Sequence, residues 1–426
     1  MPAFTMTQVF RICSSLLLAL VVFAILEVSS GVAKGDEPAA RQSEPLILAH
    51  YMPWFESQEF SGKWGWHWTM NQFDPDAIGE DGHPKIASHY HPLAGLYDSN
   101  DPKLLECHVQ QMKLAGFDGV IIDWYGTKDA NDYAMLHRNT VHLIKHIRKA
   151  GMKYAICYED QTLKHMVNQK TVRADDAVSV GKESFQWMDE NWFGDPLYAT
   201  IDGRPLLAVF GPQYFEKEQW SELRKGLRYQ PAIYSLPHVQ EKYGLDGVFG
   251  WAPAWGGKPI AFETWNGYLD QLYSREDPES YVAIAFPGFV DIYDVADVQA
   301  THGSIAHNDG KTMRHTFERA LESKSPIVQI ATWNDYGEGT MIEPTHENGY
   351  RDLEYLQSAL LSDSDYSVAD LRLPLAVYLA RKKLKGDAER QAILDQASAL
   401  ITDGKCDEAR GLLQQKKLRF LWENER

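Results

Sequence analysis

The sequence predicts an α/β protein built on a (β/α)8 TIM barrel, with a long insertion after the first strand and a small C-terminal helical hairpin. Eight short, nearly continuous apolar runs recur between residues 46 and 333, and a loop and a helical pattern follow each run. Apolar strands that alternate with helices are typical of a parallel sheet covered on both faces. A doubly wound open sheet is the competing topology.

Each expected strand is a run of about five to seven residues. The runs are Leu46–Met52, Gly119–Trp124, Tyr154–Tyr158, Pro205–Phe210, Ala232–Leu236, Gly247–Trp251, Tyr281–Phe286 and Ile327–Trp333. Helix boundaries are marked by residues that favour helix ends. Pro102 opens a helix that ends at Gly116, and a second helix from Asp129 ends at Gly151, because proline favours the first turn and glycine the position past the last turn.

The N-terminus resembles an export signal. Arg11 precedes an apolar run over residues 14–26, and small residues follow up to Ala33. This order is typical of a cleaved signal peptide, and the run is shorter than the roughly 20 residues that span a bilayer. We therefore expect a secreted or periplasmic protein with no stable membrane insertion after cleavage. An uncleaved anchor is the alternative.

The rest of the chain divides by its patterns. We expect a signal peptide over 1–33, a flexible lead-in over 34–44, a barrel domain over 45–365 and a helical tail over 366–426. Within the tail, helical patterns at 388–401 and 406–415 flank a break at Asp403-Gly404, which predicts the hairpin.

Composition narrows the class of ligand. The 426 residues include 42 Lys and Arg against 59 Asp and Glu, a formal charge of −17. Such a surface repels phosphate backbones, so no nucleic-acid partner is expected. Aromatic residues make up 12% and include 13 Trp, which suits stacking on ring-shaped ligands. No Walker loop, dinucleotide fingerprint or serine nucleophile elbow is present, so no cofactor is expected. The sequence does not indicate the oligomeric state.

The metal-binding residue types are scattered. Cys107, Cys157 and Cys406 follow neither a disulfide framework nor a zinc spacing. His89 and His91 lack an evident third ligand. We therefore predict no metal site.

Two acids after the last strand are the candidate catalytic pair. Catalytic groups of such barrels lie at the C-terminal ends of the strands, and Asp335 and Glu338 follow the last run three residues apart. Glycoside cleavage needs one carboxylic acid and a second carboxylate, and crowding of negative charge raises one pKa. The alternative is that both are solvated loop acids or helix caps.

Aromatic and polar residues at the other strand ends are expected to bind the sugar. The predicted substrate-binding residues are Tyr51, Trp54, Asp123, Trp124, Tyr125, Glu159, Trp251, Trp333 and Asn334. In the insertion, Trp64, Trp66 and Trp68 form either a stacking platform or a buried plug. Glu343 either lines the site or caps a turn.

Five segments carry a family resemblance: HYMPWF (50–55), GFDGVIIDWYG (116–126), YAICYED (154–160), AFPGF (285–289) and TWNDYGEGTMIEP (332–344). They resemble the glycoside hydrolase family 71/99-like group, whose family 99 members are endo-acting α-mannosidases on (β/α)8 barrels. The resemblance implies that Glu338 is the general acid/base and that Glu159 binds substrate. Asp335 takes the place of a glutamate that deprotonates the sugar 2-hydroxyl, and it is one methylene shorter.

We therefore expect a secreted, retaining glycoside hydrolase that acts on an α-linked oligo- or polysaccharide, with mannose-containing chains favoured. Family 71 enzymes are α-1,3-glucanases, so an α-glucan is one alternative. A non-catalytic glycan-binding barrel is another, and the shortened Asp335 favours it. A barrel that assists polysaccharide assembly is a third.

Overall fold

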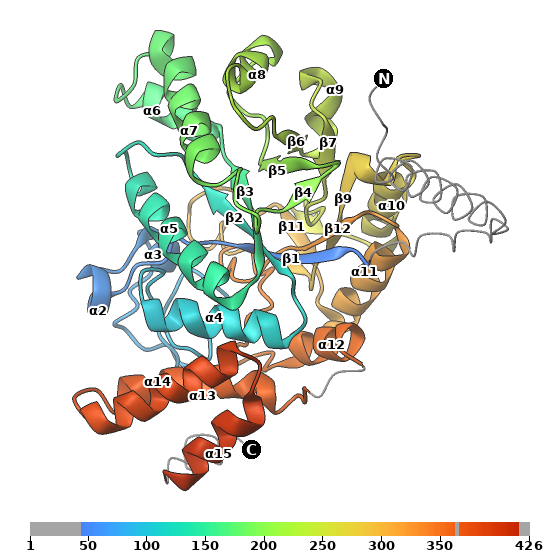
Figure 1. Ribbon diagram of the computed structural model, residues 1–426. Coiled ribbons are helices and arrows are strands. Elements are labelled where there is room, and N and C mark those ends of the chain that lie inside the picture. The colour runs from blue at the N-terminus through green and yellow to red at the C-terminus, as the bar shows by residue number, and fades with distance from the viewer. Residues whose placement is uncertain (1–43, 363–365, 417–426) are drawn as a thin grey trace, which may run out of the picture. The chain divides into compact units, whose positions relative to one another are not determined.

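The computed structural model describes residues 44–362 and 366–416 (Figure 1). The expected signal peptide (1–33) and nearly all of the lead-in lie outside the described residues. From Pro45 onward the chain forms one compact unit. Among the described residues, no helix combines the length and apolar character needed to cross a bilayer.

Parallel strands close into a barrel, as the sequence predicts. In the described ranges, the eight barrel strands are β1 (Leu46–Tyr51), β2 (Gly119–Trp124), β3 (Lys153–Tyr158), β5 (Arg204–Val209), β6 (Ala232–Ser235), β7 (Gly247–Phe249), β9 (Tyr281–Ala285) and β12 (Ile327–Ile330). Each pairs in parallel with the next, and β12 pairs with β1 through Leu46 and Ile327. Closure by this last pair rules out the open sheet.

Helices follow the strands and cover the barrel (Figure 1). In the described ranges they are α2 (Gln58–Ser61), α3 (Trp66–Thr69), α4 (Pro102–Leu114), α5 (Tyr133–Ala150), α6 (Gln161–Asn168), α7 (Ala177–Asn191), α8 (Lys217–Arg224), α9 (Gln240–Tyr243), α10 (Phe262–Tyr273), α11 (Lys311–Glu322), α12 (Arg351–Leu360), α13 (Leu373–Lys383), α14 (Ala388–Thr402) and α15 (Cys406–Gln415). Asp101 caps α4 by accepting the Lys103 N–H at 2.9 Å, and Pro102 is its first residue, as expected. The helix α5 begins at Tyr133 rather than Asp129.

Two regions at the C-terminal ends of the strands shape the site. The long connection between β1 and α4 contains α2 and α3, which accounts for the expected insertion. A small sheet joins β10 (Phe289–Val290), β11 (Gly303–Ile305) and β8 (Lys258–Pro259). Its strands come from the segments after β7 and β9, so this sheet stands at the end of the barrel where catalytic groups are expected.

The helical tail packs against α4 (Figure 1). Gln110 donates to the Ser398 carbonyl at 2.8 Å, and Arg381 forms an ion pair with Glu106 at 2.9 Å. The predicted hairpin corresponds to α14 and α15, and the additional helix α13 precedes it. These buried polar contacts tie the tail to the barrel wall.

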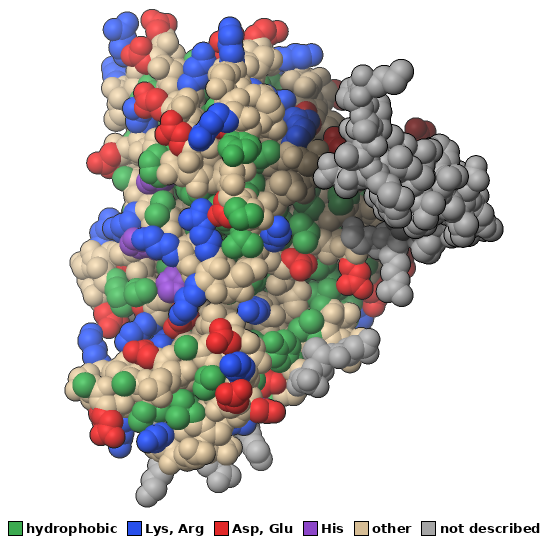
Figure 2. Space-filling model, viewed as in Figure 1, with side chains coloured by type: hydrophobic (Ala, Val, Ile, Leu, Met, Phe, Trp, Pro, Cys, Tyr) green, Lys and Arg blue, Asp and Glu red, His purple; other side chains and the backbone are tan. Residues whose placement is uncertain are grey.

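Charged side chains of both signs are interspersed over the face that Figure 2 shows.

Candidate active site

A cavity of about 360 Å³ lies at the C-terminal ends of the strands, and four carboxylic acids line it. Asp123 is the penultimate residue of β2, Glu159 follows β3, and Asp335 and Glu338 follow β12. No Lys or Arg lines this cavity within the described ranges. The expected catalytic pair therefore lies together with two of the expected binding acids. Because no Lys or Arg of the described residues lines the cavity, its negative charge is reduced by protonation of the acids themselves.

Asp335 is held by the backbone of its own loop. Its N–H donates to Thr332 Oγ1 at 2.8 Å, and its Oδ1 accepts the Glu338 N–H at 3.0 Å. Burial raises the pKa of Asp335 to about 6, and the N–H groups of Glu338 and Gly337 oppose that rise. Asp335 is therefore largely ionised at neutral pH.

Glu338 faces the cavity beside Trp251. Its Oε2 accepts the Trp251 Nε1–H at 3.1 Å, and its backbone carbonyl accepts the Val290 N–H at 2.9 Å. Burial and the neighbouring Asp335 carboxylate raise the pKa of Glu338 well above its usual range, although the Trp251 hydrogen bond opposes the rise. The pair therefore combines a more acidic Asp335 with a Glu338 that holds its proton more strongly, a separation that general acid and base chemistry requires.

The other two acids interact with each other. Burial, followed by the charges of Glu159 and Asp335, raises the pKa of Asp123 well above its usual range. Burial also raises the pKa of Glu159 to about 7, against the hydrogen bond that the Gln161 amide donates. A carboxyl group that keeps its proton can donate to a substrate hydroxyl, and an ionised one can accept.

Aromatic rings form much of the remaining wall. Trp54 stacks on His67, with ring centroids 4.1 Å apart and planes within 5°. Trp251 is flanked edge-on by His50 and Phe210, each at 4.9 Å. Rings fixed by such contacts present flat apolar surfaces, and the acids present polar atoms beside them. This mixture suits a ligand with both apolar faces and hydroxyl groups.

Four residues expected to bind sugar lie behind the wall instead of lining the cavity. The Tyr51 hydroxyl bonds to His108 at 2.9 Å, the Trp124 indole donates to His137 at 3.2 Å, and Asn334 bonds to the Met52 backbone at 2.8 and 3.0 Å. Trp333 is also fully buried. Consecutive strand residues point to opposite faces, so Asp123 facing the cavity turns Trp124 away from it. The same alternation turns His50, which the sequence analysis missed, toward the cavity and Tyr51 away from it.

Glu343 neither lines the cavity nor caps a turn. It accepts hydrogen bonds from Tyr97 at 2.8 Å and from Tyr336 at 3.1 Å, and it pairs with His108 at 3.0 Å. Tyr97 also accepts from Asn334 at 3.2 Å. This buried network anchors the segment that carries Asp335 and Glu338.

The tryptophans of the insertion are divided between the two expected roles, an exposed stacking surface and a buried plug. Trp68 is fully buried, whereas Trp66 is exposed and lines the cavity. Both lie on the single turn of α3, where residues two apart do not share a face. Trp64 is partly buried and donates to Asp76 at 3.0 Å.

Another residue that the sequence analysis missed is Tyr293, which reaches the cavity from the segment after β10. No local sequence pattern marks Tyr293 as a cavity residue.

One group of buried side chains has the residue types of a metal site. Among the described residues, ligand atoms of His50, Asp123 and Cys157 lie within 4.8 Å of one another. Burial raises the pKa of the Cys157 thiol well above its usual value, which opposes the thiolate that binds metals. His50 and Asp123 line the acidic cavity, and Asp123 also interacts with Glu159, so we assign these two residues to that cavity.

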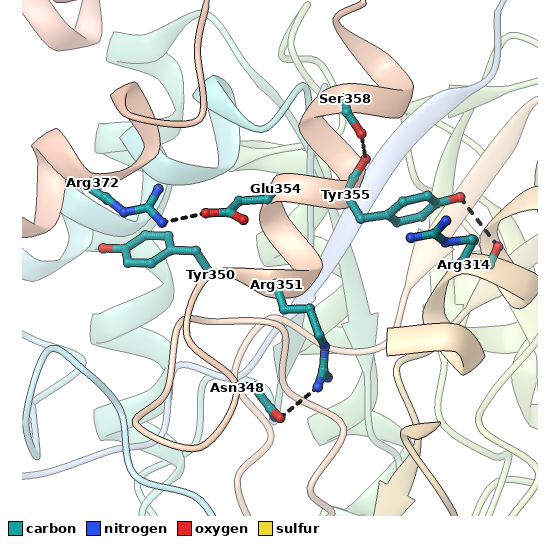
Figure 3. A pocket seen from close by; sticks show the side chains of 8 residues that line it. All are labelled: Arg314, Asn348, Tyr350, Arg351, Glu354, Tyr355, Ser358 and Arg372. Carbon is teal, nitrogen blue, oxygen red and sulfur yellow. Dashed lines mark hydrogen bonds and ion pairs between the residues drawn. The ribbon is translucent and has the colours of Figure 1, made fainter. Parts of the chain in front are cut away.

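Another hollow, of about 610 Å³, lies beside α12 and is rich in arginine (Figure 3). Arg372 pairs with Glu354 at 2.5 Å, Arg351 pairs with Asp352 at 3.1 Å, and Arg314 lies over the Tyr355 ring at 5.0 Å. These cations already have partners, so the hollow offers structural contacts rather than a reactive group.

Comparisons with known proteins bear on the class of enzyme. The family model "Glycosyl hydrolase family 71" matches residues 172–365. Glycoprotein endo-alpha-1,2-mannosidase of Mus musculus is 22% identical over 346 residues, which cover 73% of this chain and 71% of the relative. A glycoprotein endo-alpha-1,2-mannosidase-like protein of Danio rerio is 23% identical, with 70% of each chain covered. The fold matches the GH99 endo-alpha-mannosidase of Bacteroides thetaiotaomicron, with a TM-score of 0.55, 18% identity, and 77% and 98% of the two chains covered. The chain is therefore a glycoside hydrolase that resembles the family 71/99-like group.

Proposed function

We propose that the protein cleaves an α-linked, mannose-containing glycan with retention of configuration, using Glu338 and Asp335. The observation that carries the proposal is that these two carboxyl groups share one cavity and differ in pKa, with Asp335 at about 6 and Glu338 well above its usual range. One acid is thus prepared to accept a proton while the other donates one.

The proposed reaction uses both groups twice. Asp335 takes the proton of the 2-hydroxyl, whose oxygen attacks the anomeric carbon, and Glu338 protonates the glycosidic oxygen as that bond breaks. The attack forms a three-membered ring of the anomeric carbon, the second carbon and the 2-oxygen. A water molecule then gives a proton to Glu338 and attacks the anomeric carbon, which opens this three-membered ring, while Asp335 returns its proton to the 2-oxygen. Two displacements at one carbon restore its configuration. The shorter side chain of Asp335 requires the sugar to lie close to the β12 loop.

Two observations bear on the sugar. The relatives that cover about 70% of this chain are named as an endo-alpha-1,2-mannosidase and an endo-alpha-1,2-mannosidase-like protein, which favours mannose. The family 71 model covers residues 172–365, which include both acids, and favours an α-glucan as the second candidate.

The test is to incubate the protein with α-mannan and α-glucan oligosaccharides and to measure new reducing ends. Glu338→Gln keeps the side-chain shape but removes the proton donor, so we expect turnover to fall by about two orders of magnitude or more. Glu218→Gln, an exposed acid on α8, is the matched control and should retain wild-type turnover. Unchanged turnover in Glu338→Gln would refute the assignment, and binding without cleavage by the wild type would favour a non-catalytic barrel.

Export is part of the proposal and rests on the N-terminal sequence. We expect the mature protein to begin after Ala33, near Lys34. N-terminal sequencing of protein recovered from outside the cytoplasm checks this, and an intact N-terminus in the membrane fraction would favour the uncleaved anchor.

A further inference from the structure

A second cavity adjoins the acidic one on the side of β6 and β7. It has a volume of about 610 Å³, and Trp251 lines both cavities. The aromatic and polar residues that also line this second cavity are Trp255, Tyr268, His238, Gln271 and Arg275. The segments after β6 and β7 supply several of these residues, so the second cavity also lies at the C-terminal end of the barrel. Trp251, whose indole donates to Glu338, therefore also lines a neighbouring cavity.

Trp255 is exposed on an anchored loop. Half of its surface, 50%, is accessible, and one ring edge meets Tyr268 with centroids 6.3 Å apart. The loop is fixed before Trp255, where the Trp251 N–H donates to the Tyr268 hydroxyl at 3.3 Å, and after it, where the Gly257 N–H donates to the His302 carbonyl at 3.0 Å. An exposed indole held in this way is already ordered, so a ligand that covers it has less conformational entropy to remove.

Gly256 and Gly257 explain how the loop presents this ring. Their φ angles of 83° and 68° lie in the left-handed region, where glycine carries no steric penalty. The chain turns directly after Trp255 and enters β8, which pairs with β11. The ring therefore belongs to a turn that the small sheet holds in place.

The lining of this cavity indicates the class of ligand. Indole and phenol rings supply flat apolar surfaces, and His238, Gln271 and Arg275 supply polar groups of three kinds. Glu241 also lines the cavity, so its charge offsets that of Arg275. A neutral ligand with apolar faces and many hydroxyl groups fits this lining better than an anion does.

We infer that this cavity binds additional sugar units of the same glycan whose scissile bond lies between Asp335 and Glu338; the inference rests on the proposed function. We call it the Trp255 subsite. Because Trp251 borders both cavities, a chain that leaves the acids along β7 meets the Trp255 ring next. The enzyme should therefore favour longer chains over short ones.

The test compares chain lengths in matched variants. We would measure kcat/KM for a series of α-mannan or α-glucan oligosaccharides of increasing length and take the ratio of the longest to the shortest cleaved substrate. A buried aromatic contact contributes up to about 1.5 kcal/mol, which corresponds to about tenfold. Trp255→Ala should therefore lower the ratio about tenfold, whereas Trp255→Phe, which keeps a ring, should lower it by less.

Phe262→Ala is the control for this experiment. Phe262 is 49% exposed on α10, much like Trp255, and it is absent from the lining of both cavities. We expect its ratio to match that of the wild type. Circular dichroism and the thermal midpoint of each variant show whether the protein is folded.

The failure of the subsite can be separated from the failure of the proposed function. If Trp255→Ala leaves the ratio unchanged, or if the wild type gains nothing from longer chains, the subsite is overturned while loss of cleavage in Glu338→Gln still supports the function. If cleavage survives in Glu338→Gln, or if the wild type cleaves none of the substrates, the subsite is tested by binding instead. Calorimetry then measures the affinity of the wild type and of Trp255→Ala for the same oligosaccharides. Weaker binding to Trp255→Ala than to the wild type supports the subsite; equal binding, or no binding to the wild type, overturns it.

Discussion

The Oδ1 atom of Asp335 accepts the backbone N–H of Glu338 at 3.0 Å. This bond favours the ionised form of Asp335, and burial together with the resulting charge raises the pKa of Glu338. The two acids are therefore driven apart in pKa by the geometry of a single loop, which is the pattern expected of an acid and a base in one site.

The first prediction concerns the pH dependence of activity. We expect kcat/KM to rise as Asp335 ionises, with a midpoint near pH 6, and to fall at higher pH as Glu338 loses its proton. Asp335→Asn cannot accept the proton and should lose about two orders of magnitude, whereas Asp335→Glu should retain more activity than Asp335→Asn. A flat profile between pH 5 and pH 7, or an active Asp335→Asn, would contradict the assignment.

The second prediction concerns the hydrogen bond from Trp251 to Glu338. Trp251→Phe keeps an aromatic ring and removes the Nε1–H that stabilises ionised Glu338. The pKa of Glu338 should therefore rise further, and the falling limb of the pH profile should move to higher pH. A hydrogen bond to a charged group contributes about 1.5–3 kcal/mol, so the shift should be at least about one pH unit. If the rate falls but the falling side of the pH profile stays at the same pH, Trp251 acts through packing and not through its hydrogen bond to Glu338.

The third prediction concerns stability. Burial raises the pKa of Asp335 from 3.8 to about 6, so the folded protein favours the neutral form. That contribution is fully present below about pH 4 and is lost as pH rises through about 6. Asp335→Asn remains neutral, so at pH 8 it should increase the free energy of unfolding by on the order of 3 kcal/mol relative to the wild type, with little difference at pH 4. Urea unfolding at both pH values measures this, and an equal loss of stability at both would contradict it.

The fourth prediction concerns the buried network around Glu343. Tyr97→Phe removes the hydroxyl that donates to Glu343 and accepts from Asn334. We expect the free energy of unfolding to fall by about 1–3 kcal/mol and kcat to fall more than KM changes, because Asn334 adjoins Asp335. Tyr229→Phe, an exposed ring, is the control. A stability loss with unchanged kcat would limit the network to folding.

Local patterns were sufficient for the barrel and for part of its site. Apolar runs identified the strands, including β6, because burial of both sheet faces requires them. The position of Asp335 and Glu338 directly after the last run indicated the catalytic end. Strand ends were harder: the apolar patterns continued to Trp251 and Trp333, whereas β7 ends at Phe249 and β12 at Ile330.

Residues whose role depends on contacts with residues far away in the sequence could not be identified from local patterns. Tyr51 and Trp124 follow cavity residues in the chain but face the other side of the sheet, and Glu343 meets His108 from 235 positions away. The sequence by itself determined the order of strands and helices and which acids follow β12, because those signals are local. Only the tertiary structure decided which of those acids are buried together, and hence which one holds its proton, because a pKa depends on burial and on charges that the fold brings near.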